Sequence, residues 1–184
     1  MQMSSINTEL LIAQCKKHNT LAQMNLYKAY CKAMFRVAYR ITQNTELAED
    51  VVQEAFLTAF DDLHKLTDSN SFGSWLKRIV IFKSINLVKK NKKHAFINFD
   101  EVSYKIPEEN SIDDTSITDL KLNEVYNAIT NLKENYRLIL TLYYIEGFDY
   151  EEIAEITQLS YANCRTTISR AKESLRKKLT VYAS

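Results

Sequence analysis

Residues 151–179, EEIAEITQLSYANCRTTISRAKESLRKKL, indicate two short helices separated by a turn at residues 158–160. Asp149 lies just before the first helix and Glu152 follows three residues later, the spacing of a capping box at a helix N-terminus. Ser160 is a favourable N-cap residue for the second helix. Two helices joined by a three-residue turn are typical of DNA-binding domains. The sequence therefore predicts a helix–turn–helix motif.

The second helix of this pair has one apolar and one polar face. At 3.6 residues per turn, its apolar side chains fall on one stripe, which consists of Cys164, Ile168, Ala171, Leu175 and Leu179. The opposite side carries Ala162, Arg165, Thr166, Ser169 and Arg176. Arginine, threonine and serine near a helix N-terminus can donate hydrogen bonds to base edges and phosphates in a major groove. A solvated basic face is the alternative, but the two-helix spacing favours DNA binding.

The composition of the whole chain favours an all-α fold. Of its 184 residues, 46% are hydrophobic and 26% are charged, which is enough apolar material to form a core. The length fits one medium domain or two small ones. The chain has only two glycines and one proline, whereas folds rich in strands and loops need turn residues throughout.

Although the net charge is only +1, the charged residues are concentrated in one acidic and two basic segments. Residues 45–62 contain six acidic residues and no basic one, and residues 77–93 contain seven basic residues and no acidic one. Residues 165–178 contain six basic residues and one acidic residue, Glu173. This segregation predicts separate surfaces for different partners.

Helical periodicity divides the chain into two parts, because it is nearly continuous over residues 7–93 and resumes near residue 120. Between them, residues 96–118 contain the only proline, six acidic residues and no sustained period, which indicates a flexible linker. The expected fold is therefore all-α, with helical domains at residues 1–95 and 119–184 joined by an acidic linker, and with the helix–turn–helix in the second domain.

Within the first domain, the pattern predicts an amphipathic helix over residues 26–42. An acidic helix begins near Thr45, which can serve as its N-cap. Residues 63–71 are predicted to form a loop, and a further helix runs from about Phe72 towards Lys90.

Several classes of function are disfavoured by the sequence. The cysteines and histidines are scattered and show no zinc-binding spacing (Cys15, Cys31, Cys164, His18, His64 and His94). No pairing of a nucleophile with a base, or of a carboxylate with a histidine, suggests an enzyme. No signal peptide and no membrane span are apparent. We therefore expect a cytoplasmic protein with reduced thiols and no metal or cofactor.

Two separate segments resemble one protein family. Residues 136–179, YRLILTLYYIEGFDYEEIAEITQLSYANCRTTISRAKESLRKKL, resemble the promoter-reading domain of bacterial sigma factors of the extracytoplasmic-function group. Residues 26–60, LYKAYCKAMFRVAYRITQNTELAEDVVQEAFLTAF, and residues 72–80, FGSWLKRIV, resemble the other conserved domain of that group. Two matches in the correct order are more specific than a single helix–turn–helix. The resemblance implies a protein that is no enzyme, binds core RNA polymerase, directs it to promoters and helps to open the duplex.

The resemblance also implies which residues act. The second domain would read the −35 promoter element as duplex DNA, through Arg165, Thr166, Ser169 and Arg170. The acidic helix of the first domain would dock on the polymerase, through Asp50, Gln53, Glu54 and Leu57. The residues themselves are compatible with docking, because Leu57 is an apolar residue centred in a polar arc, as protein-binding surfaces often have.

The helix from Phe72 and the loop before it would bind and open the −10 element. A base flipped out of the duplex needs polar groups for its edge, and a single strand needs cations for its phosphates. The residues implied in these roles are His64, Lys65, Ser69, Asn70, Lys77, Arg78, Lys83, Asn86, Lys89 and Lys90.

Some positions depart from the pattern of the group. Phe82 stands where a polar Asn is common, and Asn163 and Cys164 replace the usual Thr-Val. Trp75 offers a ring for base stacking, but its stripe with Ile79 and Phe82 favours a tryptophan in the core. Because of these departures, the promoter sequence that this chain would recognise cannot be inferred from those of related proteins.

The main alternative is a stand-alone helix–turn–helix regulator that binds operators without polymerase. It leaves the acidic helix and the second basic segment unexplained. A dimer-forming helical scaffold is a weaker alternative, and an enzyme is the weakest. For a sigma factor, the expected partners are core RNA polymerase, promoter DNA and an anti-sigma factor of the kind that this group often has.

Overall fold

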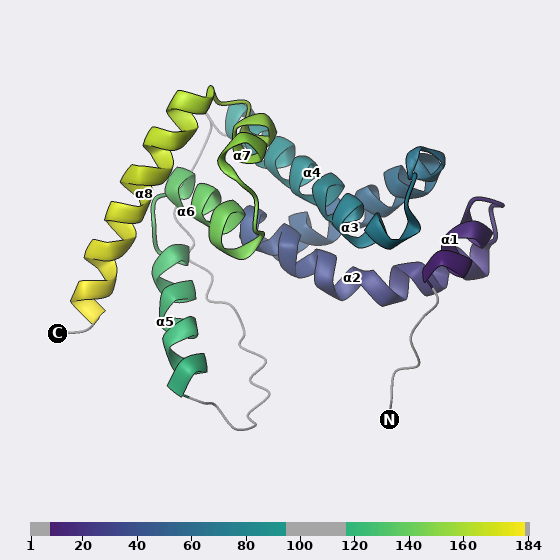
Figure 1. Cartoon of the computed structure of the whole chain (residues 1–184), viewed down its shortest axis with the longest axis horizontal. Helices are drawn as coiled ribbons and strands as arrows, with labels where there is room; N and C mark the ends of the chain where they lie inside the picture. The colour runs from purple at the N-terminus through teal and green to yellow at the C-terminus, as the bar shows by residue number, and fades with distance from the viewer. Residues whose placement is uncertain (1–7, 95–116, 183–184) are drawn as a thin grey trace. The chain divides into compact units, whose positions relative to one another are not determined.

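A computed structural model describes residues 8–94 and 117–182 of the chain, and in these ranges it contains helices and turns but no strand (Figure 1). This confirms the expected all-α fold. The chain divides into two compact units, Met1–Ile97 and Asn98–Ser184. Most of the predicted linker, residues 96–116, lies outside the described ranges. Its last two residues, Ile117 and Thr118, already belong to a helix.

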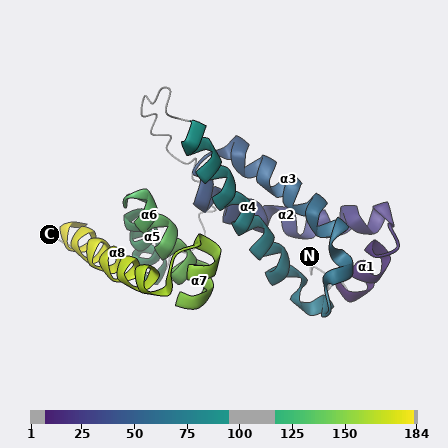
Figure 2. The same cartoon turned by 90° about the horizontal axis from the view of Figure 1, so that it is seen from above.

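The first unit is built on three long helices. Helices α2, α3 and α4 pack pairwise against one another, and α1 packs against α2 (Figure 2). Two short 3₁₀ turns occupy the segment that was predicted as a loop between α3 and α4. The bounds are Thr8–Cys15 for α1, Thr20–Thr42 for α2, Thr45–Asp61 for α3, Leu63–Lys65 and Ser69–Ser71 for the 3₁₀ turns, and Phe72–His94 for α4.

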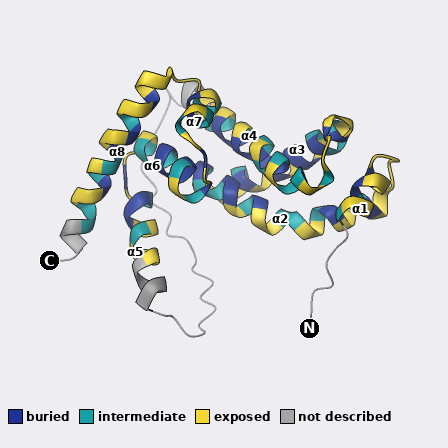
Figure 3. Ribbon diagram, viewed as in Figure 1, coloured by how far each residue is buried: buried dark blue, intermediate teal, exposed yellow. Residues whose placement is uncertain are grey.

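Small residues on α3 allow the three long helices to approach closely. Ala48, Ala55 and Ala59 have no exposed surface, and they share one buried stripe of α3 with larger residues such as Phe56 (Figure 3). Leu26 of α2 is also fully buried in this core. Because burying a large apolar side chain contributes about 1.5–3 kcal/mol, this core is the main source of stability for the first unit.

The turn between α2 and α3 is two residues long. It provides hydrogen-bond partners for backbone groups at the end of α2 and at the start of α3. Gln43 adopts the left-handed conformation (φ 54°) and its N–H donates to the Tyr39 carbonyl over 2.8 Å. Asn44 then caps α3, because its side chain accepts the Leu47 N–H at 2.9 Å. The prediction that Thr45 caps this helix is therefore wrong by one residue, since Thr45 is the first residue of α3 itself.

The start of α4 lies close against α2. A Cβ atom at Gly73 would be 3.1 Å from Cε1 of Tyr30, so glycine gives the room for this approach. The Tyr30 ring also contacts the Phe72 ring edge to face, with 5.3 Å between their centroids. Phe72 is fully buried and anchors the helix to the core.

The predicted core stripe of α4 is wrong. Trp75 and Ile79 are half-buried, and Phe82 is 49% exposed. The residues of α4 that enter the core lie on a neighbouring stripe and comprise Leu76, Val80, Ile81, Ser84 and Ile85. Because α4 carries apolar residues on most of its faces, the periodicity alone did not identify which face packs inward.

The second unit contains the helix–turn–helix. Helix α8 packs against α5, α6 and α7, and α6 continues into a π-helical turn. The core is made by fully or almost fully buried residues that include Ile139, Leu140, Leu142, Ile153 and Ile168. The bounds are Ile117–Thr130 for α5, Glu134–Leu140 for α6, Thr141–Ile145 for the π turn, Tyr150–Thr157 for α7 and Tyr161–Tyr182 for α8.

The predicted capping of α7 is confirmed. Asp149 accepts the Glu152 N–H at 2.8 Å, and the Glu152 carboxylate accepts the Asp149 N–H at 3.1 Å, a complete capping box. Gly147 turns the chain towards this cap with a φ of 79°, a conformation that other residues rarely adopt. At the other end of α7, Gln158 is left-handed (φ 61°) and starts the turn into α8.

Candidate functional site

Helix α8 buries one face and exposes the other, as its sequence predicts. The apolar stripe of Cys164, Ile168, Ala171 and Leu175 is buried, while Leu179 is half-buried. The residues implied in −35 binding are all exposed on α8: Arg165, Thr166, Ser169 and Arg170. The fold therefore leaves two guanidinium groups and two hydroxyl groups available to a ligand outside the unit.

The first turn of α8 displays further polar groups. The Ser160 hydroxyl oxygen accepts the Asn163 N–H at 3.3 Å, so Ser160 caps the helix as predicted. Tyr161 and Asn163 are exposed beside the predicted contacts, and Tyr161 is 49% exposed. Sequence reasoning did not include these two residues in the site. Their place in the first turn, which enters the major groove in helix–turn–helix proteins, is the signal that could have identified them.

One acidic residue lies among the cations of α8. The Glu173 carboxylate accepts a hydrogen bond from the Arg176 guanidinium and lies 3.8 Å from the ammonium group of Lys177. All three side chains are at least half exposed. Because DNA phosphates are negative, Glu173 opposes DNA binding by this part of the helix.

Cys164 connects α8 to the start of α7. Its side chain is fully buried, and Sγ lies 3.4 Å from the carbonyl oxygen of Tyr150, to which the thiol donates. Burial raises the pKa of the Cys164 thiol, so the group stays protonated at neutral pH. Cys164 therefore packs as a small hydrophobic residue inside the motif.

The predicted docking residues of α3 are all exposed (Asp50, Gln53, Glu54 and Leu57). Leu57 is 66% exposed and lines an apolar groove of about 380 Å³ between α2 and α3. Met24 of α2, itself 49% exposed, lines the same groove. Met24 was not among the predicted docking residues, because only the fold brings α2 alongside this part of α3.

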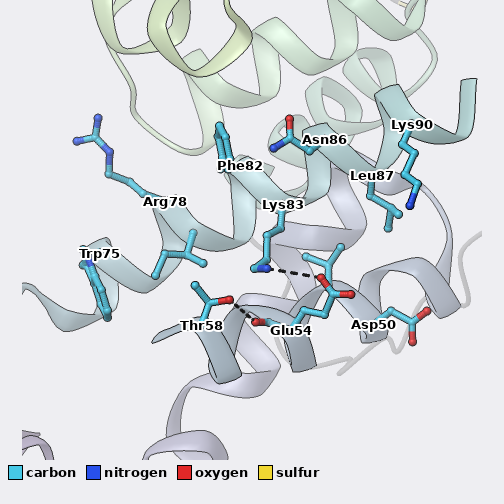
Figure 4. Close-up of a pocket in the computed structure, with 12 residues that line it drawn as sticks. Asp50, Glu54, Thr58, Trp75, Arg78, Phe82, Lys83, Asn86, Leu87 and Lys90 are labelled. Atoms are coloured by element: carbon cyan, nitrogen blue, oxygen red, sulfur yellow. Dashed lines mark hydrogen bonds and ion pairs between the residues drawn. The ribbon is translucent and has the colours of Figure 1, made fainter. Parts of the chain in front are cut away.

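A second groove, of about 740 Å³, lies between α3 and α4 (Figure 4). Asp50 and Glu54 line this groove, whereas Gln53 and Leu57 line the first one. The four predicted docking residues are therefore divided between two adjacent grooves on either side of α3. A protein partner that contacts all four would cover the exposed ridge of this helix.

Helix α4 contributes both cations and apolar surface to this second groove. Arg78, Phe82, Asn86 and Lys90 line it at successive turns of the helix. In Figure 4, Arg78, Phe82 and Asn86 extend from α4 on the side away from Glu54. The exposed Phe82 ring thus lies between residues that are implied in −10 binding, where it can contact an unstacked base.

The remaining predicted −10 residues of α4 differ in their surroundings. Lys89 is exposed, whereas Lys77 and Lys83 are half-buried. Lys83 points towards α3, where its Nζ lies 3.5 Å from Oε2 of Glu54. This ion pair joins a predicted DNA contact to a predicted docking residue.

The loop between α3 and α4 is held by local hydrogen bonds. Leu63 and Leu66 are buried and anchor it to the unit. The Lys65 ammonium pairs with Asp62 at 2.7 Å, and the His64 ring nitrogen Nδ1 lies 3.0 Å from the Asp61 carbonyl oxygen.

The second half of this loop carries the two remaining predicted −10 residues. Asn70 is exposed and donates its N–H to the Asp68 carboxylate over 3.0 Å, while Ser69 is half-buried. The predicted −10 residues of the loop thus lie in a turn that is held by hydrogen bonds, next to the start of α4.

Within the described residues, no group of three or more His, Cys, Asp or Glu side chains is placed to hold a metal ion. The three cysteines are free thiols, of which Cys15 and Cys164 are buried. None of the helices in the described ranges is long and apolar enough to cross a membrane.

Comparison with protein families finds two matches in this chain. Residues 26–94 match the model of sigma-70 region 2, and residues 122–175 match the model of sigma-70 region 4. The first range covers most of α2 and all of α3 and α4, and the second covers most of the segment from α5 to α8. The two matches therefore correspond to the two structural units.

Curated relatives and solved structures agree with these matches. The chain is 27% identical to the ECF RNA polymerase sigma factor SigW of Bacillus subtilis over 91% of this chain and 94% of that protein. It is 30% identical to the RNA polymerase sigma-H factor of Pseudomonas aeruginosa, over 76% of this chain and 77% of that protein.

Among solved structures, the sigma factor RpoE of Bartonella quintana, in complex with the anti-sigma factor NepR, has a similar fold. It aligns with a TM-score of 0.58 and 20% identity over 86% of this chain and 96% of that one. The chain therefore belongs to the sigma-70 family, in its extracytoplasmic-function group, and is a sigma factor that directs promoter-specific transcription.

Proposed function

We propose that this sigma factor divides promoter recognition between its two units. Helix α8 reads the −35 element as duplex DNA, α4 and the loop before it bind and open the −10 element, and α3 docks on core RNA polymerase. The observation that carries the proposal is the exposed polar face of α8 in a helix–turn–helix whose two helices both have capped N-termini. The assignment of the other two helices rests on the charges and exposed apolar groups that they display.

Recognition of the −35 element follows from the chemistry of four exposed side chains. Arg165 and Arg170 can each donate two hydrogen bonds to a guanine edge or to a phosphate. Thr166 and Ser169 carry hydroxyl groups that suit either kind of contact. The Thr166 hydroxyl already donates to the Ala162 carbonyl at 2.9 Å. Its oxygen therefore serves as an acceptor for a base amino group.

Binding of the −10 element is supported by the combination of groups on α4. Single-stranded DNA is bound by cations along its backbone and by aromatic rings that stack on its bases. Arg78, Lys89 and Lys90 supply cations, and the exposed ring of Phe82 supplies a stacking surface between them. His64 and Asn70 of the preceding loop add polar groups that can hydrogen-bond to a base edge.

Docking on the polymerase is supported by the exposed ridge of α3. Leu57 and Met24 provide apolar area, and Asp50 and Glu54 provide negative charge beside it. An apolar centre rimmed by charged groups is typical of protein-binding surfaces. The expected complementary surface on the polymerase is apolar with a basic rim.

A protein regulator is a further expected partner of this sigma factor, and the cytoplasm is its expected location. RpoE of Bartonella quintana was solved with an anti-sigma factor, and we propose a regulator of that kind for this chain. Such a protein would act on the same exposed surfaces. We place the sigma factor in the cytoplasm, where RNA polymerase works, and assign it no enzymatic activity of its own.

In vitro transcription from a random-promoter library tests the proposal. Bacterial core polymerase is incubated with the library with and without the full chain, and the transcripts are sequenced. New transcripts that start downstream of one shared bipartite motif are expected, and they would give the −35 and −10 preferences together. Retained duplex binding, with no new transcripts and no co-elution with core polymerase, would instead support a stand-alone regulator.

A further inference from the structure

Lys172 of α8 lies inside a cluster of three tyrosine rings. Its Nζ is 4.1 Å from the ring centroid of Tyr143, 5.5 Å from that of Tyr144 and 5.6 Å from that of Tyr150. It also donates a hydrogen bond to the Tyr150 hydroxyl over 3.2 Å. Distances of this size place the ammonium group within the range of cation–π attraction for all three rings.

The three rings come from the elements that precede the recognition helix. Tyr143 and Tyr144 belong to the π turn that follows α6, and Tyr150 is the first residue of α7. Tyr143 contacts both of the others, with 4.9 Å to the Tyr144 centroid and 5.3 Å to the Tyr150 centroid. One side chain of α8 therefore joins the end of α6 and the start of α7.

The Lys172 side chain keeps its charge in this position. Partial burial alone would lower the pKa of the Lys172 ammonium, but its hydrogen bond to Tyr150 and its interactions with the tyrosines outweigh that cost. The net direction of the pKa is upward, so the group is a cation at neutral pH. The face of an aromatic ring attracts a cation more strongly than it attracts a neutral amine.

Tyr150 is attached to α8 at two separate points. Its carbonyl oxygen accepts from Cys164, and its hydroxyl accepts from Lys172. Eight residues separate these two donors, which is about 12 Å along a helix. Two hydrogen bonds from positions this far apart on α8 act together with the apolar packing of α8 to set its direction relative to α7.

We propose that Lys172 is a positioning residue for −35 recognition, which sets the angle of α8 through the tyrosine cluster and does not contact a DNA phosphate. The inference rests on the proposed function of α8 as the −35 reader. It assigns Lys172 a role different from that of the exposed cations of the same helix, although all of them have the same charge.

The experiment compares three variants of the full chain in transcription with core polymerase, on the promoter recovered from the library. Lys172→Met removes the charge and keeps the length of the side chain. Lys172→Arg keeps a cation that can stack on the rings and donate to Tyr150. Lys177→Met is the matched control, because it removes one exposed lysine charge from the same helix.

The readout is the ratio of transcription between the recovered −35 sequence and single-base variants of it, at roughly 50 and 200 mM KCl. For Lys172→Met we expect this ratio to fall by about five- to tenfold, because a tilted α8 makes its contacts with the base edges less well and these contacts set the ratio. The loss should persist at the lower salt concentration, and Lys172→Arg should restore the ratio. Simple loss of folded protein would lower all promoters equally and leave the ratio unchanged.

Three results would overturn the inference. An unchanged ratio in Lys172→Met would show that the cluster does not position α8. Recovery of Lys172→Met at low salt, as expected for Lys177→Met, would identify Lys172 as a phosphate contact. Failure of Lys172→Arg to restore the ratio would show that the cation is not what holds the helices.

A measurement on the protein alone separates this inference from the proposed function. Amide hydrogen exchange in α7 should become at least several times faster in Lys172→Met and stay unchanged in Lys177→Met. Unchanged exchange in both variants would contradict the inference. If the wild-type chain supports no promoter-specific transcription, the proposed function fails, while the exchange data still decide whether Lys172 holds α7.

Discussion

The ammonium group of Lys83 on α4 lies 3.5 Å from the carboxylate of Glu54 on α3, so a predicted DNA contact is paired with a predicted docking residue (Figure 4). The Lys83 side chain is 26% exposed and that of Glu54 is 69% exposed. A cation that is predicted to bind DNA phosphate and an anion that is predicted to bind the polymerase therefore form an ion pair with each other in the first unit. We expect binding of either partner to compete with this contact.

A double-mutant cycle with Lys83→Met and Glu54→Gln should give a small coupling free energy. Because exposed ion pairs are screened by water and salt, we expect a coupling of about 0.2–1 kcal/mol in the free energy of unfolding. Urea denaturation of the wild type, both single variants and the double variant measures it. A coupling above about 2 kcal/mol would mean that the pair is a structural element of the first unit.

Truncation of Leu57 should weaken polymerase binding without unfolding the first unit. Leu57 is 66% exposed, so Leu57→Ala removes little buried area. Together with Asp50→Ala it should reduce affinity for core polymerase by at least tenfold, since apolar anchors at an interface centre are worth about 2 kcal/mol or more. Leu21→Ala is the matched control, because Leu21 is 70% exposed on α2 and does not line either groove. Equal affinities of the double variant and the control for core polymerase would refute this docking surface.

Arg165→Ala should reduce promoter use mainly through the −35 sequence. If the guanidinium reads a base, the variant loses about 1–3 kcal/mol of discrimination at one position. Transcription from a set of promoters with single −35 substitutions measures this. An equal loss on every promoter would instead indicate a phosphate contact. In that case, the slope of the logarithm of the DNA-binding constant against the logarithm of the salt concentration should also become shallower by about one.

Glu173→Gln should strengthen binding to DNA of any sequence. The substitution removes the negative charge beside Arg176 and Lys177, so that this part of α8 no longer repels phosphates through a carboxylate. We expect a larger effect at low salt and no change in the −35 base preference. Weaker binding confined to one −35 base pair would show that the Glu173 carboxylate reads a cytosine amino group.

The buried thiol of Cys164 should make the second unit less stable in alkali. Because burial raises the pKa of the folded thiol above its unfolded value, the stabilisation is complete below the unfolded pKa of about 8.5. It is lost as the pH rises through the folded pKa. Between pH 8 and 10, the free energy of unfolding should therefore fall more steeply in the wild type than in Cys164→Ser, by up to about 1.4 kcal/mol per pH unit. Parallel pH profiles for the two proteins would contradict this assignment.

The sequence predicted the fold well where each helix had one distinct apolar face. The stripe of Cys164, Ile168, Ala171 and Leu175 is buried as expected, because the other faces of α8 are polar. The capping box of α7 was predicted equally well, since it depends only on residues three apart. Helix caps and the buried face of a helix with one apolar side can therefore be predicted directly from the sequence.

The prediction failed where several faces of a helix are apolar. Helix α4 has apolar residues on most sides, so packing against α2 and α3 decided that Leu76 and Ile81 are buried and that Phe82 is exposed. The same limit applies to the functional surfaces. The proximity of Met24 to Leu57, and of Lys172 to three tyrosines, depends on tertiary contacts that no local pattern records.

The most direct test of the central claim is site-specific photo-cross-linking in the polymerase–promoter complex. A photoreactive amino acid replaces Ser169 on α8 in one variant and Asn86 on α4 in another, and both are exposed positions. We predict that position 169 cross-links to the −35 duplex and position 86 to the −10 region. Cross-links from both positions to the same element, or to no DNA in active complexes, would contradict the proposed division of promoter recognition.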